Sequence, residues 1–173
     1  MLLADVAFTA GMYVQGFPEY GPERMGAPIT AYNRLDDHVI RVHSNIYEPD
    51  IVVVVDETLI KAVDVTAGLK PGGKLLINSK RRAEDILKEF PEINAEIYVI
   101  DAADISIRYI GKNIPNSPLL SAVARLTGLI PEAEFMKSVE EAISHKFASK
   151  PAVIQGNVDS IKESWNAVIR INE

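Results

Sequence analysis

A run of five β-branched side chains, Ile51 to Val55, limits the possible folds of this chain more than any other segment. β-Branched residues favour strands, and a strand that is apolar on both faces must be covered on both faces. Such strands occur mainly in parallel sheets that lie between two layers of helices. The run therefore predicts an α/β fold with a buried, mostly parallel sheet.

Strand-like and helix-like segments alternate after this run. Residues 74–78 form an apolar strand that follows a turn of one lysine, one proline and two glycines. That glycine pair precedes a strand, not a helix, so it is not expected to cradle a phosphate. Residues 93–100 predict a further strand. Helices are expected over 2–11, 57–68, 79–90 and 101–109.

Before the run, the pattern favours antiparallel pairing. Residues 13–17 alternate like a short strand, and residues 27–36 alternate like a second one. Asp36 and Asp37 mark a tight turn. We therefore expect residues 39–42 to pair back on the 27–36 strand as an antiparallel hairpin.

From residue 116 onward the pattern contains only helices. Asn116 is a candidate cap for a helix over 117–129, and Pro131 can start a helix that runs to Phe147. Residues 151–171 predict the last helix. Apolar stripes on these helices indicate core or subunit contacts.

The expected architecture is a three-layer α/β/α domain with a mostly parallel, mixed sheet and a helical C-terminal region. We expect a single domain over residues 1–173. Within it, residues 1–115 form the α/β core and residues 116–173 form the helical C-terminal part.

Charge and composition exclude several classes of protein. The formal net charge of −6 argues against a nucleic-acid partner and against an anionic membrane surface. Purely apolar runs reach about five residues, far below the roughly 20 that a spanning helix needs. The chain also lacks the cationic start of a signal peptide, so the cytoplasm is the expected location.

The chain contains no cysteine, which excludes disulfides and a cysteine-ligated iron–sulfur cluster within it. Its three histidines, His38, His43 and His145, have no metal-ligand spacing, so no metal site is expected. No nucleophile, base and orienting group can be assembled, and no phosphate-loop or dinucleotide fingerprint occurs. No catalytic residue is therefore assigned.

The best candidate for ligand binding is the loop from Pro18 to Gly26, with two prolines and two glycines in nine residues. Arg24 is permanently charged and can fork two hydrogen bonds to a phosphate or carboxylate. The alternative is a surface ion pair between Arg24 and Glu19 or Glu23. The residues alone leave both possibilities open.

A second candidate is Asp56, at the carboxyl end of the buried strand. It can cap the next helix or bind a ligand, and capping is the favoured interpretation.

Several segments closely resemble the gamma subunit, or gamma domain, of 2-oxoacid:ferredoxin oxidoreductases, and the resemblance covers nearly the whole chain. The main one reads Phe-Pro-Glu-Tyr-Gly-Pro-Glu-Arg-Met-Gly-Ala-Pro at residues 17–28. The Gly-Ala-Pro that ends this segment resembles the pyruvate or branched-chain type. The other matching segments are Tyr13-Val14-Gln15, residues 46–50, Thr58-Leu59 and Ile114-Pro115-Asn116.

The resemblance implies one subunit of an enzyme that oxidatively decarboxylates a 2-oxoacid. The acyl group would pass to coenzyme A and the electrons to ferredoxin. Thiamine diphosphate and iron–sulfur clusters are implied on partner alpha, beta and ferredoxin-like subunits, and no cofactor on this chain alone. Its implied role is to help enclose the co-substrate coenzyme A through Glu23, Arg24, Met25 and Gly26.

The sequence departs from the family at its start. Family members begin with a strand and a Gly-x-Gly-Gly-Gln-Gly turn, whereas Met1 already belongs to the first helix. We therefore expect the DNA upstream of the Met1 codon to encode this strand and turn in frame. Two alternatives stay open: a non-catalytic assembly subunit of the same complex, and an independent nucleotide-binding enzyme.

Overall fold

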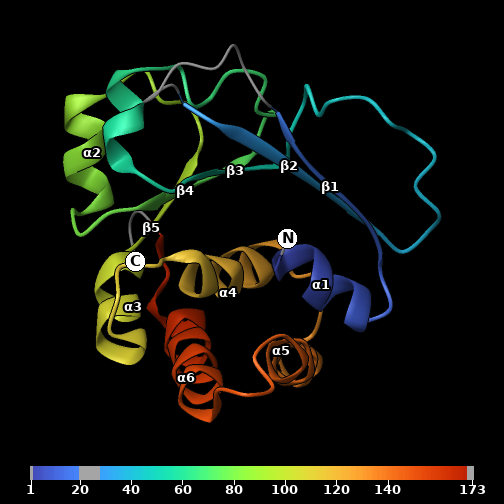
Figure 1. Ribbon diagram of the computed structural model, residues 1–173. Coiled ribbons are helices and arrows are strands. Elements are labelled where there is room, and N and C mark those ends of the chain that lie inside the picture. Colours follow the sequence, from blue (N-terminus) through green and yellow to red (C-terminus); the bar gives the residue numbers. More distant parts are fainter. Residues whose placement is uncertain (1, 20–27, 171–173) are drawn as a thin grey trace.

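The computed structural model describes residues 2–19 and 28–170. Its main sheet has the strand order β3-β4-β5-β6, in which β3, β4 and β5 run parallel and β6 runs antiparallel to β5 (Figure 1). These strands are β3 (Ile51–Val54), β4 (Lys74–Asn78), β5 (Glu96–Ile100) and β6 (Ile169–Arg170). The predicted mostly parallel, mixed sheet is confirmed.

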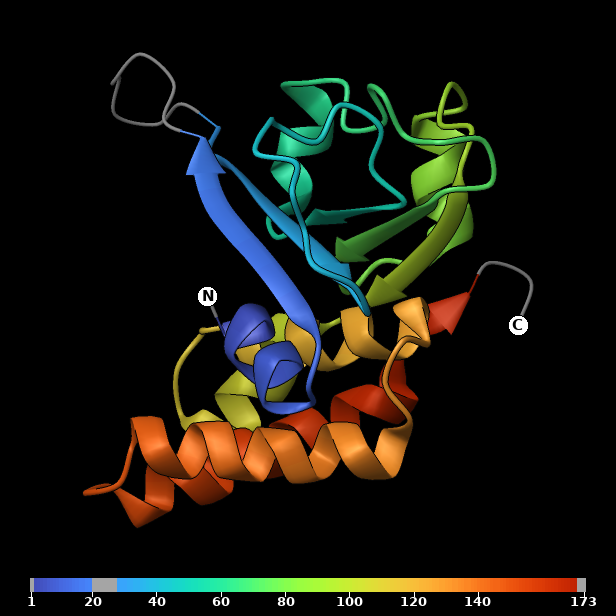
Figure 2. The same cartoon turned by 90° about the vertical axis from the view of Figure 1, so that its right-hand side faces the viewer.

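Helices cover both faces of the main sheet (Figures 1 and 2). The 3-10 helix η1 (Glu57–Lys61) and α2 (Ala83–Glu89) pack on one face, and α3 (Ala102–Ile110) and α4 (Asn116–Thr127) pack on the other. Successive residues of β4 point to opposite faces, so Leu75 joins one core and Leu76 the other. The result is the expected three-layer arrangement.

β3 lies at the edge of this sheet. It pairs with β4 on one side, and none of the described strands pairs with its other side. Both of its faces are nevertheless covered, because Val52 and Val54 pack in one core and Ile51 and Val53 in the other. β3 therefore has the side chains of a central strand at an edge position.

A further core lies on the side of α4 that faces away from the main sheet. It joins α1 (Leu2–Thr9), α4, α5 (Glu132–Lys146) and α6 (Pro151–Ala167). The rings of Phe135 and Trp165 stack there with centroids 5.3 Å apart. None of the described helices is both long and apolar enough to cross a membrane.

A two-stranded antiparallel sheet forms an arm beside this body (Figure 2). β1 (Tyr13–Glu19) and β2 (Thr30–Asp36) pair along their whole length, from Tyr13 opposite Asp36 to Glu19 opposite Thr30. Val14 and Leu35 anchor one end of this hairpin in the core around α1 and α5.

The prediction that residues 39–42 pair with the 27–36 strand is wrong, because β2 pairs with β1 instead. The Asp36 carboxylate accepts a hydrogen bond from the His38 backbone N–H (2.9 Å), which forms a side-chain turn that leads the chain away from β2. Residues 37–49 contain no strand.

Three predicted helix boundaries are also corrected. The helix over 57–68 stops at Lys61, and Asp64 then forms its own turn by accepting from the N–H and hydroxyl of Thr66 at 2.9 and 2.7 Å. The helix over 79–90 begins only at Ala83. The helix over 151–171 ends at Ala167, and the chain returns to pair with β5 as β6.

The predicted cap at Asn116 is wrong as well. Asn116 lies inside α4, and Pro115 occupies the cap position without a side-chain hydrogen bond.

Candidate functional site

The predicted coenzyme A residues Glu23, Arg24, Met25 and Gly26 lie outside the described residues. The strand ends that flank them are described. Glu19 ends β1 and Thr30 begins β2, and the two face each other at the end of the hairpin away from α1 (Figure 2). The hairpin therefore fixes both ends of the connection that contains Arg24.

A small polar network stiffens this end of the hairpin. Glu19 Oε2 accepts a hydrogen bond from the Tyr32 hydroxyl (2.6 Å), and Glu19 Oε1 accepts one from Asn45 Nδ2 (3.1 Å). The hydrogen bond to the Glu19 carboxylate raises the pKa of the Tyr32 hydroxyl. The ring of Phe17 lies 5.3 Å from that of Tyr32. Glu19, one of the predicted ion-pair partners of Arg24, thus accepts one hydrogen bond at each carboxylate oxygen.

A second network binds the irregular segment 37–48 to the hairpin. The Arg34 guanidinium donates to the carbonyls of Val42 and Ser44, each at 3.2 Å, and to the side chain of Gln15. Gln15 also hydrogen-bonds the ring of His43 (3.0 Å). Sequence reasoning missed Arg34, because strand alternation indicates its face but not what covers that face.

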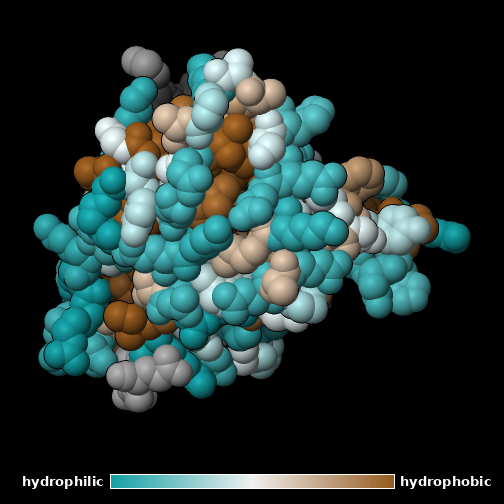
Figure 3. All heavy atoms as spheres, turned by 90° about the horizontal axis from the view of Figure 1, so that it is seen from below, coloured by the Kyte–Doolittle hydropathy of each residue, from teal (hydrophilic) through white to brown (hydrophobic). Residues whose placement is uncertain are grey.

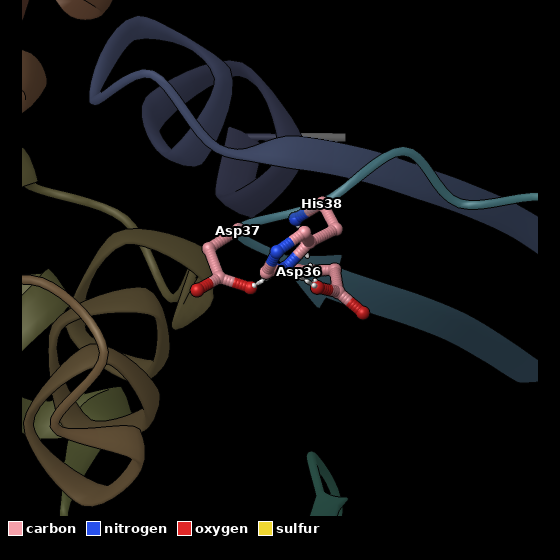
Figure 4. Close-up of side chains that lie close together, drawn as sticks. All are labelled: Asp36, Asp37 and His38. Carbon is pink, nitrogen blue, oxygen red and sulfur yellow. Dashed lines mark hydrogen bonds and ion pairs between the residues drawn. The ribbon is translucent and has the colours of Figure 1, made fainter.

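The segment 37–48 lies on the outer side of the arm. It projects at the right of Figure 1 and, seen from below, at the right of Figure 3. At its start, Asp36, Asp37 and His38 bring three possible metal-ligand atoms within 4.8 Å of one another (Figure 4). His38 Nδ1 lies 2.5 Å from Asp37 Oδ1, and this carboxylate raises the pKa of His38. Consecutive exposed turn residues reach this geometry without an ion, so we assign no metal to them.

The other candidate region is a cleft of about 460 Å³ at the carboxyl ends of β3, β4 and β5. In open α/β sheets, ligands bind at this edge. We call it the strand-end cleft, and its lining residues are Val55, Asp56, Glu57, Asn78, Ser79, Lys80, Asp101, Ala103, Asn113 and Pro115.

Asp56 caps η1, as the favoured interpretation predicts. Its Oδ1 accepts from the Thr58 backbone N–H (2.9 Å) and the Thr58 hydroxyl (2.7 Å). These hydrogen bonds, the one from the hydroxyl first, lower the pKa of Asp56. Asp101 Oδ1 caps α3 in the same way by accepting from the Asp104 N–H (2.9 Å).

Two further side chains connect the strand ends. Asn78 donates to the Val55 carbonyl (2.9 Å) and accepts from the Ala103 N–H (3.3 Å), so it joins β3 to the start of α3. The Ser79 hydroxyl donates to the Glu57 carboxylate. Asp56, Asn78, Ser79 and Asp101 therefore have structural roles in the cleft.

Comparison with known proteins identifies the chain. The family described as pyruvate ferredoxin/flavodoxin oxidoreductase matches residues 1–167. The pyruvate/ketoisovalerate oxidoreductases common subunit gamma of Thermococcus kodakarensis is 41% identical over 168 residues, which cover 97% of this chain and 88% of that protein. The pyruvate synthase subunit PorC of Thermotoga maritima is 41% identical over 167 residues, which cover 96% of this chain and 85% of that protein.

Solved structures of oxidoreductase subunits are also similar to this chain. The crystal structure of pyruvate oxidoreductase subunit PORC from Thermotoga maritima has a TM-score of 0.82 and 36% identity, and the match covers 99% of this chain and 88% of that one. A 2-oxoglutarate:ferredoxin oxidoreductase from Magnetococcus marinus shares the fold alone, with a TM-score of 0.68 and 17% identity over 96% of this chain and 27% of that longer one. This chain therefore belongs to the pyruvate ferredoxin/flavodoxin oxidoreductase family, as a chain of its gamma-subunit type.

Proposed function

We propose that this chain helps to enclose coenzyme A in a pyruvate-type 2-oxoacid:ferredoxin oxidoreductase. The complex would oxidatively decarboxylate a 2-oxoacid, transfer the acyl group to coenzyme A and pass the electrons to ferredoxin. Family membership supports this role, since similar chains are named as subunits of pyruvate and ketoisovalerate oxidoreductases.

The observation that carries the proposal is the stiffened end of the hairpin. Glu19 and Thr30 face each other there, and Glu19 is hydrogen-bonded to Tyr32 and Asn45. Residues 20–29 form the connection between these two strand ends in the sequence. Arg24 lies within that connection and supplies the charged, forked donor that suits a phosphate group of coenzyme A.

The remaining chemistry belongs to partner subunits in this proposal. The chain has no cysteine, so alpha, beta and ferredoxin-like subunits would carry the iron–sulfur clusters and thiamine diphosphate. The word "common" in the name of the Thermococcus relative supports a subunit that serves more than one oxoacid. We accordingly place the choice of oxoacid on the partner subunits.

The test is Arg24→Ala in the assembled complex. Loss of one charge-assisted phosphate contact should cost about 1.5–3 kcal/mol and raise the apparent KM for coenzyme A by roughly 10- to 150-fold. The KM for the oxoacid should change little. Arg41→Ala is the matched control, because Arg41 is an exposed arginine of the same arm. Unchanged coenzyme A kinetics in an intact complex would refute the role of Arg24.

The exposed side chains of segment 37–48 favour a second candidate, an assembly subunit that binds no ligand. Val39, Val42 and Tyr47 are 59%, 55% and 75% exposed, which is unusual for neighbouring apolar side chains. If Arg24→Ala dissociates the complex while the remaining intact enzyme keeps its KM for coenzyme A, the assembly candidate is the better one.

A further inference from the structure

A chain of three side chains, Arg34, Gln15 and His43, ties segment 37–48 to the hairpin, and the function proposed above does not use it. Arg34 and Gln15 face each other on β2 and β1. The Arg34 guanidinium donates to Gln15 Oε1, and Gln15 Nε2 lies 3.0 Å from His43 Nδ1. The roles of these atoms as donors and acceptors decide when the chain of hydrogen bonds can form.

Arg34 fixes the direction of each hydrogen bond in this chain. A guanidinium can only donate, so the Gln15 atom next to it has to be the carbonyl oxygen. The NH2 group of Gln15 then faces His43, and an NH2 group also can only donate. His43 Nδ1 therefore has to accept, which it can do only in a neutral ring that carries its proton on Nε2.

Protonation of His43 removes this acceptor. The imidazolium carries a proton on both ring nitrogens, so its Nδ1–H would point at the NH2 group of Gln15. Turning the Gln15 amide over offers its oxygen to His43 but sets its NH2 group against the Arg34 guanidinium. Either arrangement leaves two donors facing each other and breaks one hydrogen bond of the chain.

A protonated His43 would also bring a second positive charge to Arg34. The Arg34 guanidinium donates to the carbonyls of Val42 and Ser44, at 3.2 Å each, and these are the residues on either side of His43. A guanidinium and an imidazolium held in this arrangement repel each other. Charge and hydrogen bonding therefore act against segment 37–48 in the same direction.

The acidic side chains on this face of the hairpin already have partners. Strand alternation places Glu19 and Asp36 on the same face as Gln15 and Arg34, and both acids accept hydrogen bonds from other groups. None of the ion pairs between described residues includes His43. The other ionisable side chains of this face and of segment 37–48 are Tyr13, Tyr32, Asp37, His38, Arg41, Tyr47 and Glu48.

We infer that His43 is a proton-sensitive switch of the arm. Its neutral ring holds segment 37–48 on the hairpin, and its protonation releases the segment as the pH falls through the usual titration range of histidine. His43 is exposed, so protons from the solvent reach its ring directly. Acidification thereby changes the outer surface of the arm, independently of Arg24 and of coenzyme A.

Nitrogen-15 NMR of the His43 ring in the full chain tests the assigned proton. At about pH 8, above the usual titration range of histidine, the ring should carry its proton on Nε2. A proton on Nδ1 would overturn the inference, since Gln15 could then not donate to that atom.

Backbone order parameters of residues 40–46 measure the release. They should fall from about 0.8 at about pH 8 to below about 0.6 at about pH 5, while those of β4 stay unchanged. Equal values for residues 40–46 at the two pH values would contradict the switch.

Two variants remove the conflict between donors in different ways. His43→Asn offers Gln15 an acceptor oxygen at every pH, so the order parameters of segment 37–48 should no longer depend on pH. Gln15→Glu accepts from Arg34 and from a protonated His43, so the segment should stay ordered at about pH 5. Loss of order at that pH in either variant would overturn the inference.

His38→Asn is the matched control. His38 is the other histidine of segment 37–48, and its ring contacts Asp37 and Asp36, not Gln15. This variant should keep the full pH dependence of the order parameters. If the dependence disappears in the control as it does in His43→Asn, the switch cannot be assigned to His43.

Discussion

The main sheet and the hairpin arm are both β structure, but different forces hold them in place. Leu75, Leu76 and Ile77 of β4 are fully buried between two helical layers. The arm is anchored in the core at one end, and farther out the hydrogen bonds that Arg34 donates and Glu19 accepts replace apolar burial. Burial follows from hydropathy along the chain, whereas these hydrogen bonds depend on which segments meet. The sheet is therefore predictable from the sequence, whereas the arm depends on contacts between distant segments.

The largest expected effect is on the sheet. Leu76→Ala should lower the free energy of unfolding by about 2–5 kcal/mol, because it removes buried methyl groups and leaves a cavity between β4 and the α3–α4 layer. Denaturant unfolding followed by circular dichroism measures this loss. Val39→Ala in the arm is the control and should change stability by less than about 0.5 kcal/mol. Similar losses in both variants would contradict the division between sheet and arm.

A smaller effect is expected from Arg34→Met, which keeps the side-chain length but removes the donors to Val42 and Ser44. Each lost hydrogen bond is worth about 0.5–1.5 kcal/mol. Hydrogen exchange should therefore speed up in segment 37–48 while the amides of β4 stay protected. Arg41→Met is the control from the same segment. Faster exchange throughout the main sheet would show that the arm and the sheet unfold together.

The smallest effect concerns the turn at the end of β2. Hydrogen bonding and charge from Asp37 raise the pKa of His38 above its ordinary value of 6.5, and the hydrogen bond to His38 in turn lowers the pKa of Asp37 below 3.8. The His38 contribution to stability is thus fully present below its unfolded pKa and disappears as pH rises through the raised value. The Asp37 contribution disappears as pH falls through the lowered value.

NMR titration of the His38 ring tests this pair. Asp37→Asn should shift the titration of His38 to lower pH, and the global unfolding temperature should barely move because both side chains are exposed. If the titration of His38 is the same in Asp37→Asn, the ion pair between these two side chains is refuted.

The sequence predicted those parts of the fold that follow from local pattern. The run Ile51–Val55 indicated a strand covered on both faces, and β3 is covered on both faces. Asp56 was favoured as a cap because it lies between a buried strand and the next predicted helix, and it is one. Both features require only neighbouring residues.

Features that depend on distant contacts were missed. β6 forms because Val168 leaves α6 in an extended conformation beside β5, some 70 residues away in sequence. The partner of β2 was wrong for a similar reason, since residues 39–42 are nearer in sequence than β1. The strand-end cleft gathers residues from four segments, and only Asp56 was named among them as a candidate ligand-binding residue. The coenzyme A role of Glu23, Arg24, Met25 and Gly26 remains a prediction.

One edge of β3 pairs with none of the described strands, and this has a consequence for handling the isolated chain. Its four residues, Ile51 to Val54, carry no charge, proline or bulge that would discourage another strand from pairing with them. Pairing between two such edges is bimolecular, so its rate grows with the square of the chain concentration, whereas folding is independent of concentration. Slow expression and dilute refolding should therefore recover more usable protein than any change of salt, to which an uncharged edge is nearly indifferent.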